Sequence, residues 1–297
     1  MVDVSIILVN YNSTRLILNC LDSIEKKTTV SYEILIVDNC SNENIDDLLI
    51  RESNNVHILK SKENLGFGKA NNLALPLAKG RNVLFLNPDT ILMNSAIDQM
   101  TSFLDNNVNV GACGGNLYDS MSCPTRSFKR YFPSVFWELC STFSYSVVER
   151  IFYGKNRFFN NTDKPINVAY IVGADLMVKR EVLNQLKVCF NPLFFMYYEE
   201  IELCYRIHKL GYQLINVPAA KIQHLEGKST KASYFKAEQH FKSINQYYKL
   251  CYPSYKYKMF KLIYIMKILS RLLYFKLSGK PNFDYWKLHF RMMLNKS

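Results

Sequence analysis

Nearly continuous apolar runs alternate with amphipathic segments along the first third of the chain. Each run is rich in Val, Ile and Leu, which is typical of strands buried on both faces, and each intervening segment repeats its apolar residues at helical spacing. This alternation predicts an α/β fold built from βαβ units. The predicted strands are 5–9, 33–37, 56–59 and 82–86, and the predicted helices are 16–26, 44–52 and 69–78.

Polar residues follow each of the four predicted strands. The carboxyl ends of parallel strands meet at one edge of a sheet, and ligands of open α/β sheets bind there. Loops are polar in any case, so each residue alone carries little weight, but together they predict a binding site. In strand order they are Asn10 and Asn12, then Asp38, then Lys60 and Lys62, then Asn87 and Asp89.

A cluster of acids occurs later in the chain, after predicted strands at 170–178 and before one at 212–217. If a helix begins near Glu199, then Glu199, Glu202 and Arg206 share one face, while Glu200 points elsewhere and is left to act. The alternative is a charged first turn that the helix dipole stabilises. We expect Glu202 to pair with Arg206 in a structural role.

Seven short motifs run through the chain in order. They are Asn10-Tyr11-Asn12, Val37-Asp38-Asn39, Asn64-Leu65-Gly66-Phe67-Gly68, Leu86-Asn87-Pro88-Asp89, Gly173-Ala174, Phe195-Met196-Tyr197-Tyr198-Glu199-Glu200-Ile201-Glu202-Leu203 and His224. In order and spacing they resemble those of the family 2 inverting glycosyltransferases, and among these the bacterial rhamnosyltransferases. The resemblance covers about residues 3–230. Seven ordered motifs are far more specific than any one alone.

The resemblance implies a glycosyltransferase A-type fold, which is Rossmann-like, and transfer of a sugar from a nucleotide-sugar donor with inversion. It places the catalytic base on Glu200, where the family has Asp, with Glu199 as the stand-in. It places a site for Mn²⁺ or Mg²⁺ on Asp89, His224 and Asn87, where Asn87 stands at the first position of the family's D-x-D motif. Carboxylate oxygen suits both ions, and Mn²⁺ also accepts imidazole nitrogen.

Further residues of these motifs are candidates for donor binding. Asp38 has the chemistry to accept the imide N–H of uracil or thymine, although an Asp at a strand end also suits a plain turn. Four basic residues are candidates for contacts with phosphate, and ordinary solvation at the surface is the alternative interpretation. They are Arg126, Lys62, Lys129 and Arg130. The complete donor-binding set is Asn10, Asn12, Asp38, Asn64, Gly66, Asn71, Asn87, Asp89 and Arg126.

Charge divides the chain into two parts. The net charge is +12, and residues 228–297 hold fifteen Lys or Arg against two acids, which leaves residues 1–227 at −1. We therefore expect a catalytic domain over 1–228 and a basic helical extension over 229–297. The eight cysteines form no C-x-x-C pair or framework spacing, which favours buried thiols in a reducing compartment. No run of about 18 uncharged apolar residues occurs, so no spanning helix is expected.

The extension contains an apolar stripe at helical spacing. Cations and aromatic residues flank it, which fits a helix lying on an anionic membrane surface. The alternative is a helix that packs on the catalytic core or in a homodimer, and nucleic acid is disfavoured because no recognition motif accompanies the charge. The stripe comprises Met259, Leu262, Ile263, Met266, Leu269, Leu273 and Leu277.

Together with the charge and the apolar stripe, the resemblance implies a metal-dependent glycosyltransferase at the cytoplasmic face of a bacterial membrane. It would extend a lipid-linked saccharide of a surface polysaccharide such as O-antigen or capsule. Rhamnose from dTDP-rhamnose is the first expectation, with transfer from a UDP-hexose or a UDP-N-acetylhexosamine as the alternative. A non-catalytic scaffold that binds a sugar nucleotide or a membrane is the alternative of another class.

Overall fold

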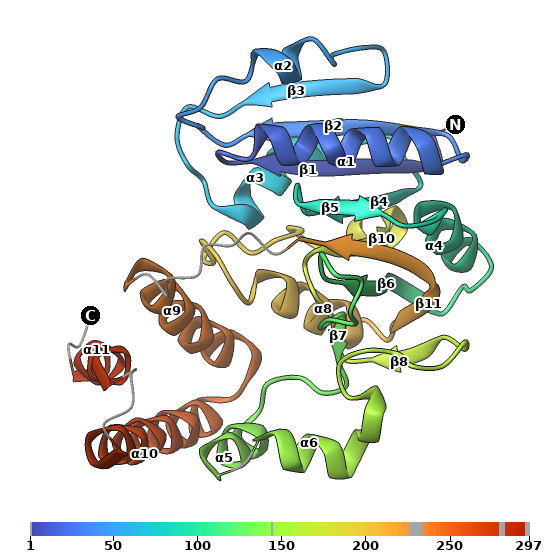
Figure 1. Cartoon of the computed structure of the whole chain (residues 1–297). Coiled ribbons are helices and arrows are strands. Elements are labelled where there is room, and N and C mark those ends of the chain that lie inside the picture. Colours follow the sequence, from blue (N-terminus) through green and yellow to red (C-terminus); the bar gives the residue numbers. More distant parts are fainter. Residues whose placement is uncertain (1, 144, 226–233, 279–282, 295–297) are drawn as a thin grey trace. The chain divides into compact units, whose positions relative to one another are not determined.

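The computed structural model describes residues 2–143, 145–225, 234–278 and 283–294 (Figure 1). The chain folds into two compact units. The segment from residue 229, which the sequence sets apart, falls in the second unit together with two earlier segments. The first unit comprises Met1–Tyr131, Lys155–Phe195 and Glu199–Gly227, and the second comprises Phe132–Gly154, Met196–Tyr198 and Lys228–Ser297.

The first unit is built on a nine-stranded mixed sheet. Four strands pair in parallel in the order β3-β2-β1-β4, as the alternation of strands and helices predicts. β10 then enters antiparallel between β4 and β6, and β6 pairs in parallel with β11. The strands are β1 (Val4–Asn10), β2 (Tyr32–Asp38), β3 (Val56–Lys60), β4 (Asn82–Leu86), β5 (Thr90–Leu92), β6 (Val110–Tyr118), β8 (Ile166–Val168), β10 (Asp175–Lys179) and β11 (Gln213–His224), and a separate pair joins β7 (Phe128–Lys129) to β9 (Tyr170–Ile171).

Helices cover both faces of this sheet. On one face Leu84 joins Ile17 and Met100 in a single hydrophobic cluster, and on the other Phe85 packs edge-on against Phe190. Because successive strand residues point to opposite faces, both covered faces demand apolar side chains, which explains the continuous apolar runs. The helices of the first unit are α1 (Thr14–Lys27), α2 (Asp46–Leu49), α3 (Phe67–Ala74), α4 (Ala96–Asp105), α7 (Arg180–Leu183) and α8 (Glu199–Lys209).

Three predicted elements differ from the structure. The helix expected over 44–52 is the single turn α2, and the strand expected over 170–178 divides into β9 and β10, with the site residues Gly173 and Ala174 in the gap. The last strand continues past Val217 to His224, through an irregularity between Asn216 and Lys221. His224 is therefore the last residue of β11 and pairs with Thr90 of β5.

The second unit is helical and has an aromatic core. The rings of Tyr248 and Phe260 stack 3.9 Å apart, and Tyr264 donates to or accepts from Nδ1 of the buried His289 at 2.8 Å. Stacked and edge-on aromatic pairs add to the free energy of burial, so few helices suffice to form this core. The helices are α5 (Val135–Phe143), α6 (Tyr145–Tyr153), α9 (Tyr234–Cys251), α10 (Ser254–Ser278) and α11 (Phe283–Leu294).

Helix α10 buries a face that the sequence pattern does not single out. Phe260, Tyr264 and Ile268, spaced four residues apart, are buried against the other helices. The predicted stripe lies on the opposite side of α10, because its residues fall about half a turn away. Six of its members, from Met259 to Leu277, are between 48% and 78% exposed. Within the second unit, therefore, the stripe takes no part in the aromatic core.

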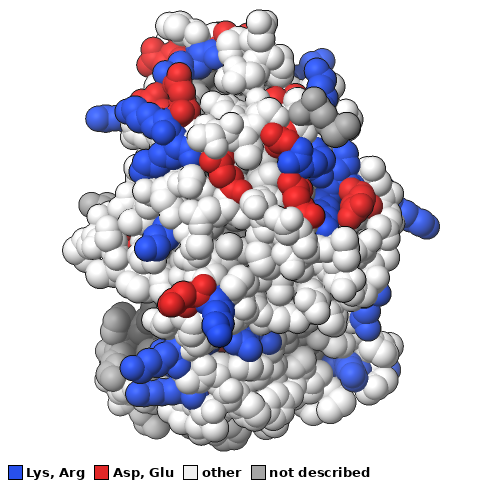
Figure 2. All heavy atoms as spheres, turned by 90° about the vertical axis from the view of Figure 1, so that its right-hand side faces the viewer, with Lys and Arg blue, Asp and Glu red and all other residues white. Residues whose placement is uncertain are grey.

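Charged side chains are unevenly distributed over the surface. Figure 2 shows basic side chains beside acidic ones over part of the face that it draws, and basic ones with few acidic neighbours elsewhere. In the first unit, Arg51 pairs with Asp22 and Arg81 pairs with Asp105. The uneven surface follows from the scarcity of acids after residue 227.

All eight cysteines are free thiols. The prediction that they are buried holds for Cys20, Cys113, Cys189 and Cys204, and it is wrong for the exposed Cys40 and Cys123. Among the described residues, no helix combines the length and apolar character needed to cross a membrane.

Candidate active site

The polar residues that follow the parallel strands meet at one edge of the sheet. Asn10 lies opposite Asp38, and Asp38 lies opposite Lys60, in the register of the three strands. The Asn10 amide donates to Oδ1 of Asp38 at 3.1 Å, and both side chains are buried. This bond fixes the Asp38 carboxylate at the strand end, as a group that recognises a ligand must be fixed.

The glycine loop packs against the segment that leads to the acidic helix. Gly66 has a positive φ of +77°, and a Cβ at this position would lie 2.2 Å from the backbone oxygen of Phe195. Asn64 accepts from the Asn39 amide at 3.0 Å and from the Gly66 N–H at 3.0 Å, so the loop is held to the end of β2. Asn39 is a positioning residue that our candidate set omits, although its motif includes it.

Two other residues predicted to bind the sugar donor have identifiable roles in the fold. Asn71 donates to the Phe67 carbonyl at 2.9 Å and is buried, and its Oδ1 atom has no partner among the described residues. Asn12 has a positive φ and accepts from the Asn42 N–H at 2.8 Å. Asn71 therefore offers an acceptor atom to a ligand, whereas Asn12 shapes the loop after β1.

Asn87, Asp89 and His224 come together as the motifs predict. His224 Nε2 lies 3.2 Å from Oδ1 of Asp89 and 3.3 Å from the Asn87 amide nitrogen. The backbone N–H of Leu225 donates to the Asp89 carbonyl, which joins the end of β11 to this loop. The chain thus brings residues 137 positions apart into one polar cluster.

This cluster has the chemistry of a divalent cation site. Adjacent ligand atoms on an octahedral ion with bonds of about 2.1 Å are about 3 Å apart, close to the spacing of Asp89 and His224. Turning the Asn87 amide would present its oxygen to the same point. In the described part of the chain, no group of three or more His, Cys, Asp and Glu is arranged to hold a metal ion, so a bound ion would need further ligands besides these side chains.

Asp175 is a buried acid of this region that our sequence reasoning misses. It begins β10, and its Oδ2 accepts the Gly115 N–H at 2.6 Å, while Oδ1 has no partner among the described residues. Burial raises its pKa to about 7, while the Gly115 hydrogen bond and the electrostatic influence of His224 act in the opposite direction. The pattern shows Asp175 as a polar residue within a strand, and only the tertiary pairing brings it into electrostatic reach of His224.

The acidic helix α8 begins at Glu199, as predicted, and its first two acids face different surroundings. Glu199 is buried, and its Cβ lies 3.6 Å from the point where a side chain on Gly68 would begin. The Glu200 side chain lies along Gly173, whose missing Cβ would be 3.5 Å from both Cβ and Cγ of Glu200. Gly173 therefore leaves space beside Glu200 that a larger residue would fill.

Both carboxyl groups hold protons more strongly than an exposed glutamate does. Burial is the main cause, and it raises the pKa of Glu200 to about 7. Burial and the neighbouring charge of Glu200 raise the pKa of Glu199 well above its usual value. The Oε2 atom of each residue is buried without a partner among the described residues. A proton acceptor with a pKa near neutrality is what general base catalysis requires.

Glu202 has the predicted structural role. It forms a two-point ion pair with Arg206, with both N–O distances at 2.8 Å. Arg206 also donates to the backbone oxygens of Val188 and Cys189. This pair fastens α8 to the preceding loop and leaves Glu199 and Glu200 as the acids available for chemistry.

The backbone directly before Glu199 is strained. Tyr197 and Tyr198 both have positive φ values, of 69° and 67°. Bulky residues rarely adopt this conformation, and such strain gathers at functional sites. Two consecutive residues of this kind set the direction in which α8 begins.

The basic candidates do not form one group. Arg126 and Lys62 are exposed, and no hydrogen bond or ion pair joins either to another described residue of the candidate site. Lys129 is 2% exposed and lies 5.6 Å from the ring centre of Tyr131, so solvation at the surface is the wrong interpretation for it. The structure thus gathers the polar and acidic candidates but leaves Arg126 at the surface.

Residues 5–187, more than half of the chain, match the sequence profile of glycosyl transferase family 2. The chain belongs to this family. The profile ends before Glu199, so the acids of α8 and His224 lie outside the matched region.

Three relatives are similar over different lengths. Glycosyltransferase GlyG of Streptococcus pneumoniae is 27% identical over 33% of this chain, and the chain spans 33% of that protein's length. The Escherichia coli UDP-Glc:alpha-D-GlcNAc-diphosphoundecaprenol beta-1,3-glucosyltransferase WfgD is 31% identical over 35% of this chain and 42% of its own. The Mycobacterium tuberculosis N-acetylglucosaminyl-diphospho-decaprenol L-rhamnosyltransferase is 25% identical over 71% of this chain and 72% of its own.

Two solved structures share the fold. GalNAc-T7 with UDP, GalNAc and Mn²⁺ has a TM-score of 0.64 at 15% identity and matches 100% of this chain and 56% of its own. The mannosyltransferase PcManGT of Pyrobaculum calidifontis, with GDP-Man and Mn²⁺, has a TM-score of 0.59 at 15% identity, over 98% of this chain and 84% of its own. The predicted glycosyltransferase A-type fold is thereby confirmed.

Proposed function

We propose that this family 2 glycosyltransferase transfers a sugar with inversion from a nucleotide-sugar donor to an acceptor hydroxyl, with Glu200 as the base. The observation that carries the proposal is the Glu200 carboxylate itself. It has a raised pKa and an unpartnered buried oxygen, and its side chain lies beside Gly173. Glu200 lies in the first turn of α8. The nearby acid Glu202 forms an ion pair with Arg206 and is not available.

The proposed reaction needs one carboxylate. Glu200 takes the proton of the acceptor hydroxyl while that oxygen attacks the anomeric carbon of the donor. The bond from this carbon to the nucleoside diphosphate breaks on the opposite face, which inverts the configuration. Glu200 then holds the proton, and the diphosphate leaves as an anion. Glu199 is the alternative base because its carboxylate is also buried and unpartnered.

The donor base would lie at the end of β2. The Asn10 amide occupies one oxygen of Asp38 and leaves the other for the imide N–H of uracil or thymine. Asn39 and Asn64 hold the adjoining glycine loop. Asn71 of α3 has a buried Oδ1 atom that would accept a hydrogen bond from the donor. Arg126, exposed near β7, would contribute only if the donor reaches that surface.

Asp89, His224 and Asn87 would hold Mn²⁺ or Mg²⁺. When bound, the ion would neutralise charge on the donor diphosphate. The chain's own contribution is to fix the Asp89 and His224 side chains 3.2 Å apart at the ends of β11 and its neighbouring loop.

We further propose a lipid-linked saccharide as the acceptor, in the synthesis of a bacterial surface polysaccharide such as O-antigen or capsule. The names of the two relatives from E. coli and M. tuberculosis support this, because both describe acceptors with a diphospho-polyprenol carrier. The longer alignment favours rhamnose, with dTDP-rhamnose as its donor, and the shorter one favours a UDP-hexose.

Such an acceptor would bring the enzyme to the cytoplasmic face of the plasma membrane. The exposed stripe of α10 supports peripheral binding there, since apolar side chains flanked by Lys256, Lys258, Lys261 and Lys276 suit an anionic leaflet. We therefore propose that anionic lipid covers the exposed stripe of α10.

A thermal-shift screen of UDP-, dTDP- and GDP-sugars, with and without Mn²⁺, tests the donor assignment. We expect stabilisation by dTDP-rhamnose or by one UDP-sugar, increased by Mn²⁺ and reduced in Asp89→Asn. Glu200→Gln should keep this shift and lose transfer to a diphospho-polyprenol acceptor. A chain that binds no sugar nucleotide would favour the scaffold alternative, whereas a Glu200→Gln variant with full transfer would overturn Glu200 as the base.

A further inference from the structure

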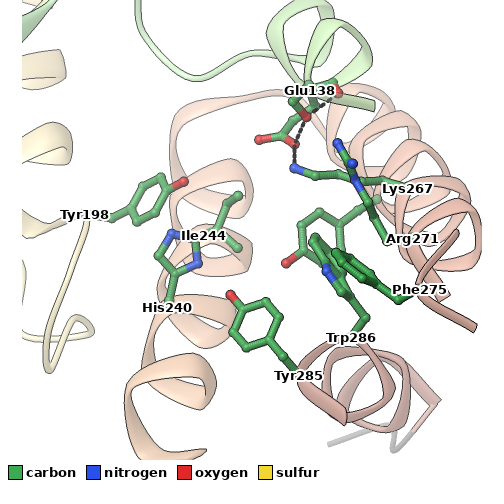
Figure 3. Close-up of a pocket in the computed structure, with 11 residues that line it drawn as sticks. Glu138, Tyr198, His240, Ile244, Lys267, Arg271, Phe275, Tyr285 and Trp286 are labelled. Carbon is green, nitrogen blue, oxygen red and sulfur yellow. Dashed lines mark hydrogen bonds and ion pairs between the residues drawn. The ribbon is translucent and has the colours of Figure 1, made fainter. Parts of the chain in front are cut away.

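The second unit contains a cavity of about 440 Å³ that the reaction described above does not use. It lies among α5, α9, α10 and α11, and Tyr198 closes one side (Figure 3). A cavity of this size accommodates a small molecule or part of a larger one. Tyr198 directly precedes Glu199 and Glu200 in the chain, so whatever fills the cavity contacts the segment that begins the catalytic helix.

The cavity holds one cation whose charge is not balanced by an ion pair. Lys267 lies 3.4 Å from Glu138, and both side chains are largely buried, so these two charges offset each other. Arg271, one turn further along α10, forms no hydrogen bond or ion pair with the described residues, although it lines the cavity. A guanidinium in this position favours an anion with several oxygens, above all phosphate.

Neutral polar atoms and aromatic rings complete the lining. His240 lies opposite α10 in Figure 3, and its Nδ1 is buried without a partner in the described part of the chain. Burial and the charge of Lys267 lower the pKa of His240, so its ring is uncharged at neutral pH. Phe275, Tyr285 and Trp286 supply apolar and aromatic surface beside Arg271.

This combination suits a phosphate joined to an apolar chain. A free sugar would not need the unbalanced guanidinium, and inorganic diphosphate would not need the aromatic wall. We propose that this cavity binds the diphosphate and the first isoprene units of a polyprenyl-linked acceptor, with Arg271 on the phosphate and Phe275 and Trp286 on the chain. The assignment rests on the proposed lipid-linked acceptor and adds to it the site that recognises the lipid carrier.

Isothermal titration of the full chain with farnesyl diphosphate, farnesol and inorganic diphosphate tests the assignment. We expect farnesyl diphosphate to bind at least about 10-fold more tightly than either part alone, because both surfaces then contribute. Arg271→Met should weaken this binding about 10-fold or more, since a hydrogen bond to a charged group is lost. Lys249→Met, at an exposed position on α9 that does not line the cavity, is the matched control and should bind as the wild type does.

Fluorescence of Trp286 locates the ligand. The chain has two tryptophans, Trp137 and Trp286, so Trp137→Phe leaves the one that lines the cavity. Quenching or a shift of its emission by farnesyl diphosphate is expected. An unchanged spectrum despite binding would move the ligand elsewhere and overturn the proposal, as would equal affinity for inorganic diphosphate or full affinity in Arg271→Met.

The donor screen separates this proposal from the reaction itself. Arg271→Met should keep the nucleotide-sugar shift, because Arg271 takes no part in the sheet-edge site. Binding of farnesyl diphosphate by a chain without a nucleotide-sugar shift would remove the proposed function and leave the anion site. A nucleotide-sugar shift without binding of farnesyl diphosphate would leave the proposed transfer reaction in place and overturn the proposed site for the lipid carrier.

Discussion

The Glu200 carboxylate must lose its proton before it can act as a base. Its pKa of about 7 therefore predicts a transfer rate that rises about tenfold per pH unit below 7 and levels above it. Initial rates at saturating donor and acceptor would reveal this profile. Glu199→Gln should keep both the profile and most of the rate. Loss of transfer in Glu199→Gln but not in Glu200→Gln would assign the base to Glu199, and a flat profile would contradict a base of raised pKa.

The same carboxylate costs stability at high pH. Its pKa of about 7 in the fold exceeds the ordinary value of 4.5, so between these pH values the folded state binds more protons than the unfolded state. The contribution of Glu200 to the free energy of unfolding therefore falls as pH rises from about 4.5 to about 7. Glu200→Gln should be about 1–3 kcal/mol more stable than the wild type at about pH 8 and gain little at about pH 5.

Urea denaturation at both pH values would measure this difference. Glu202→Gln is the control with the opposite sign, because it leaves Arg206 without its partner in a largely buried pair. It should lower the free energy of unfolding by about 3 kcal/mol. Equal stability of Glu200→Gln and the wild type at about pH 8 would contradict the burial of this carboxylate.

Gly66 is required both for its positive φ and for the space that its missing Cβ leaves, whereas Gly211 is required only for its positive φ. Alanine at Gly66 would need a positive φ and would place Cβ 2.2 Å from the Phe195 oxygen, whereas at Gly211 it would need only the positive φ. We expect Gly211→Ala to cost about 1–2 kcal/mol and Gly66→Ala about 2–5 kcal/mol. Gly66→Ala should also weaken donor binding. Thermal unfolding of both variants would decide, and equal losses would mean that the loop moves away from Phe195.

At the scale of single residues, the sequence predicts those candidates whose partners are local or set by strand order. Asn10 and Asp38 follow adjacent parallel strands, so their meeting is predictable from register. Asp175 is not predictable in this way. Its place beside Gly115 depends on β10 entering antiparallel between β4 and β6, a pairing that no local pattern specifies.

Among the elements, those with one clear periodicity are predictable from sequence. β1 to β4 and α1 are continuous or singly periodic and appear close to their expected bounds. α10 is apolar on two opposite faces, so its sequence pattern is consistent with burial of either face. The regular apolar spacing favours the face of Leu262 and Leu269, whereas the aromatic core buries the face of Phe260 and Tyr264. Only the packing of the other helices decides between them.

The two faces of α10 should respond differently to substitution. A Leu262→Gln, Met266→Gln, Leu269→Gln variant changes exposed side chains, so thermal unfolding should be nearly unchanged while retention on anionic vesicles falls. Phe260→Ala, on the buried face, should cost about 3–5 kcal/mol. Vesicle co-sedimentation measures the first effect. A triple variant that unfolds early would show that its stripe is covered, by a second copy of the chain or by the first unit.

The charge of the whole molecule determines how its membrane binding should depend on salt. Residues 228–297 carry an excess of thirteen positive charges, and residues 1–227 are nearly neutral, so attraction to anionic lipid comes almost wholly from one part of the chain. Such attraction weakens as the screening length shortens, whereas burial of apolar side chains does not.

Raising the salt concentration from about 50 mM to about 500 mM should therefore release the triple α10 variant from vesicles of anionic lipid much more completely than the wild type, whose stripe still inserts. Vesicles of neutral lipid supply the control, and both proteins should bind them weakly. Electrophoretic mobility of DNA at the same salt concentrations separates a lipid surface from a nucleic acid. Tighter, sequence-independent binding to DNA than to anionic vesicles would assign the basic segment to nucleic acid, because charge alone attracts both partners and only a lipid surface also accommodates the exposed apolar stripe.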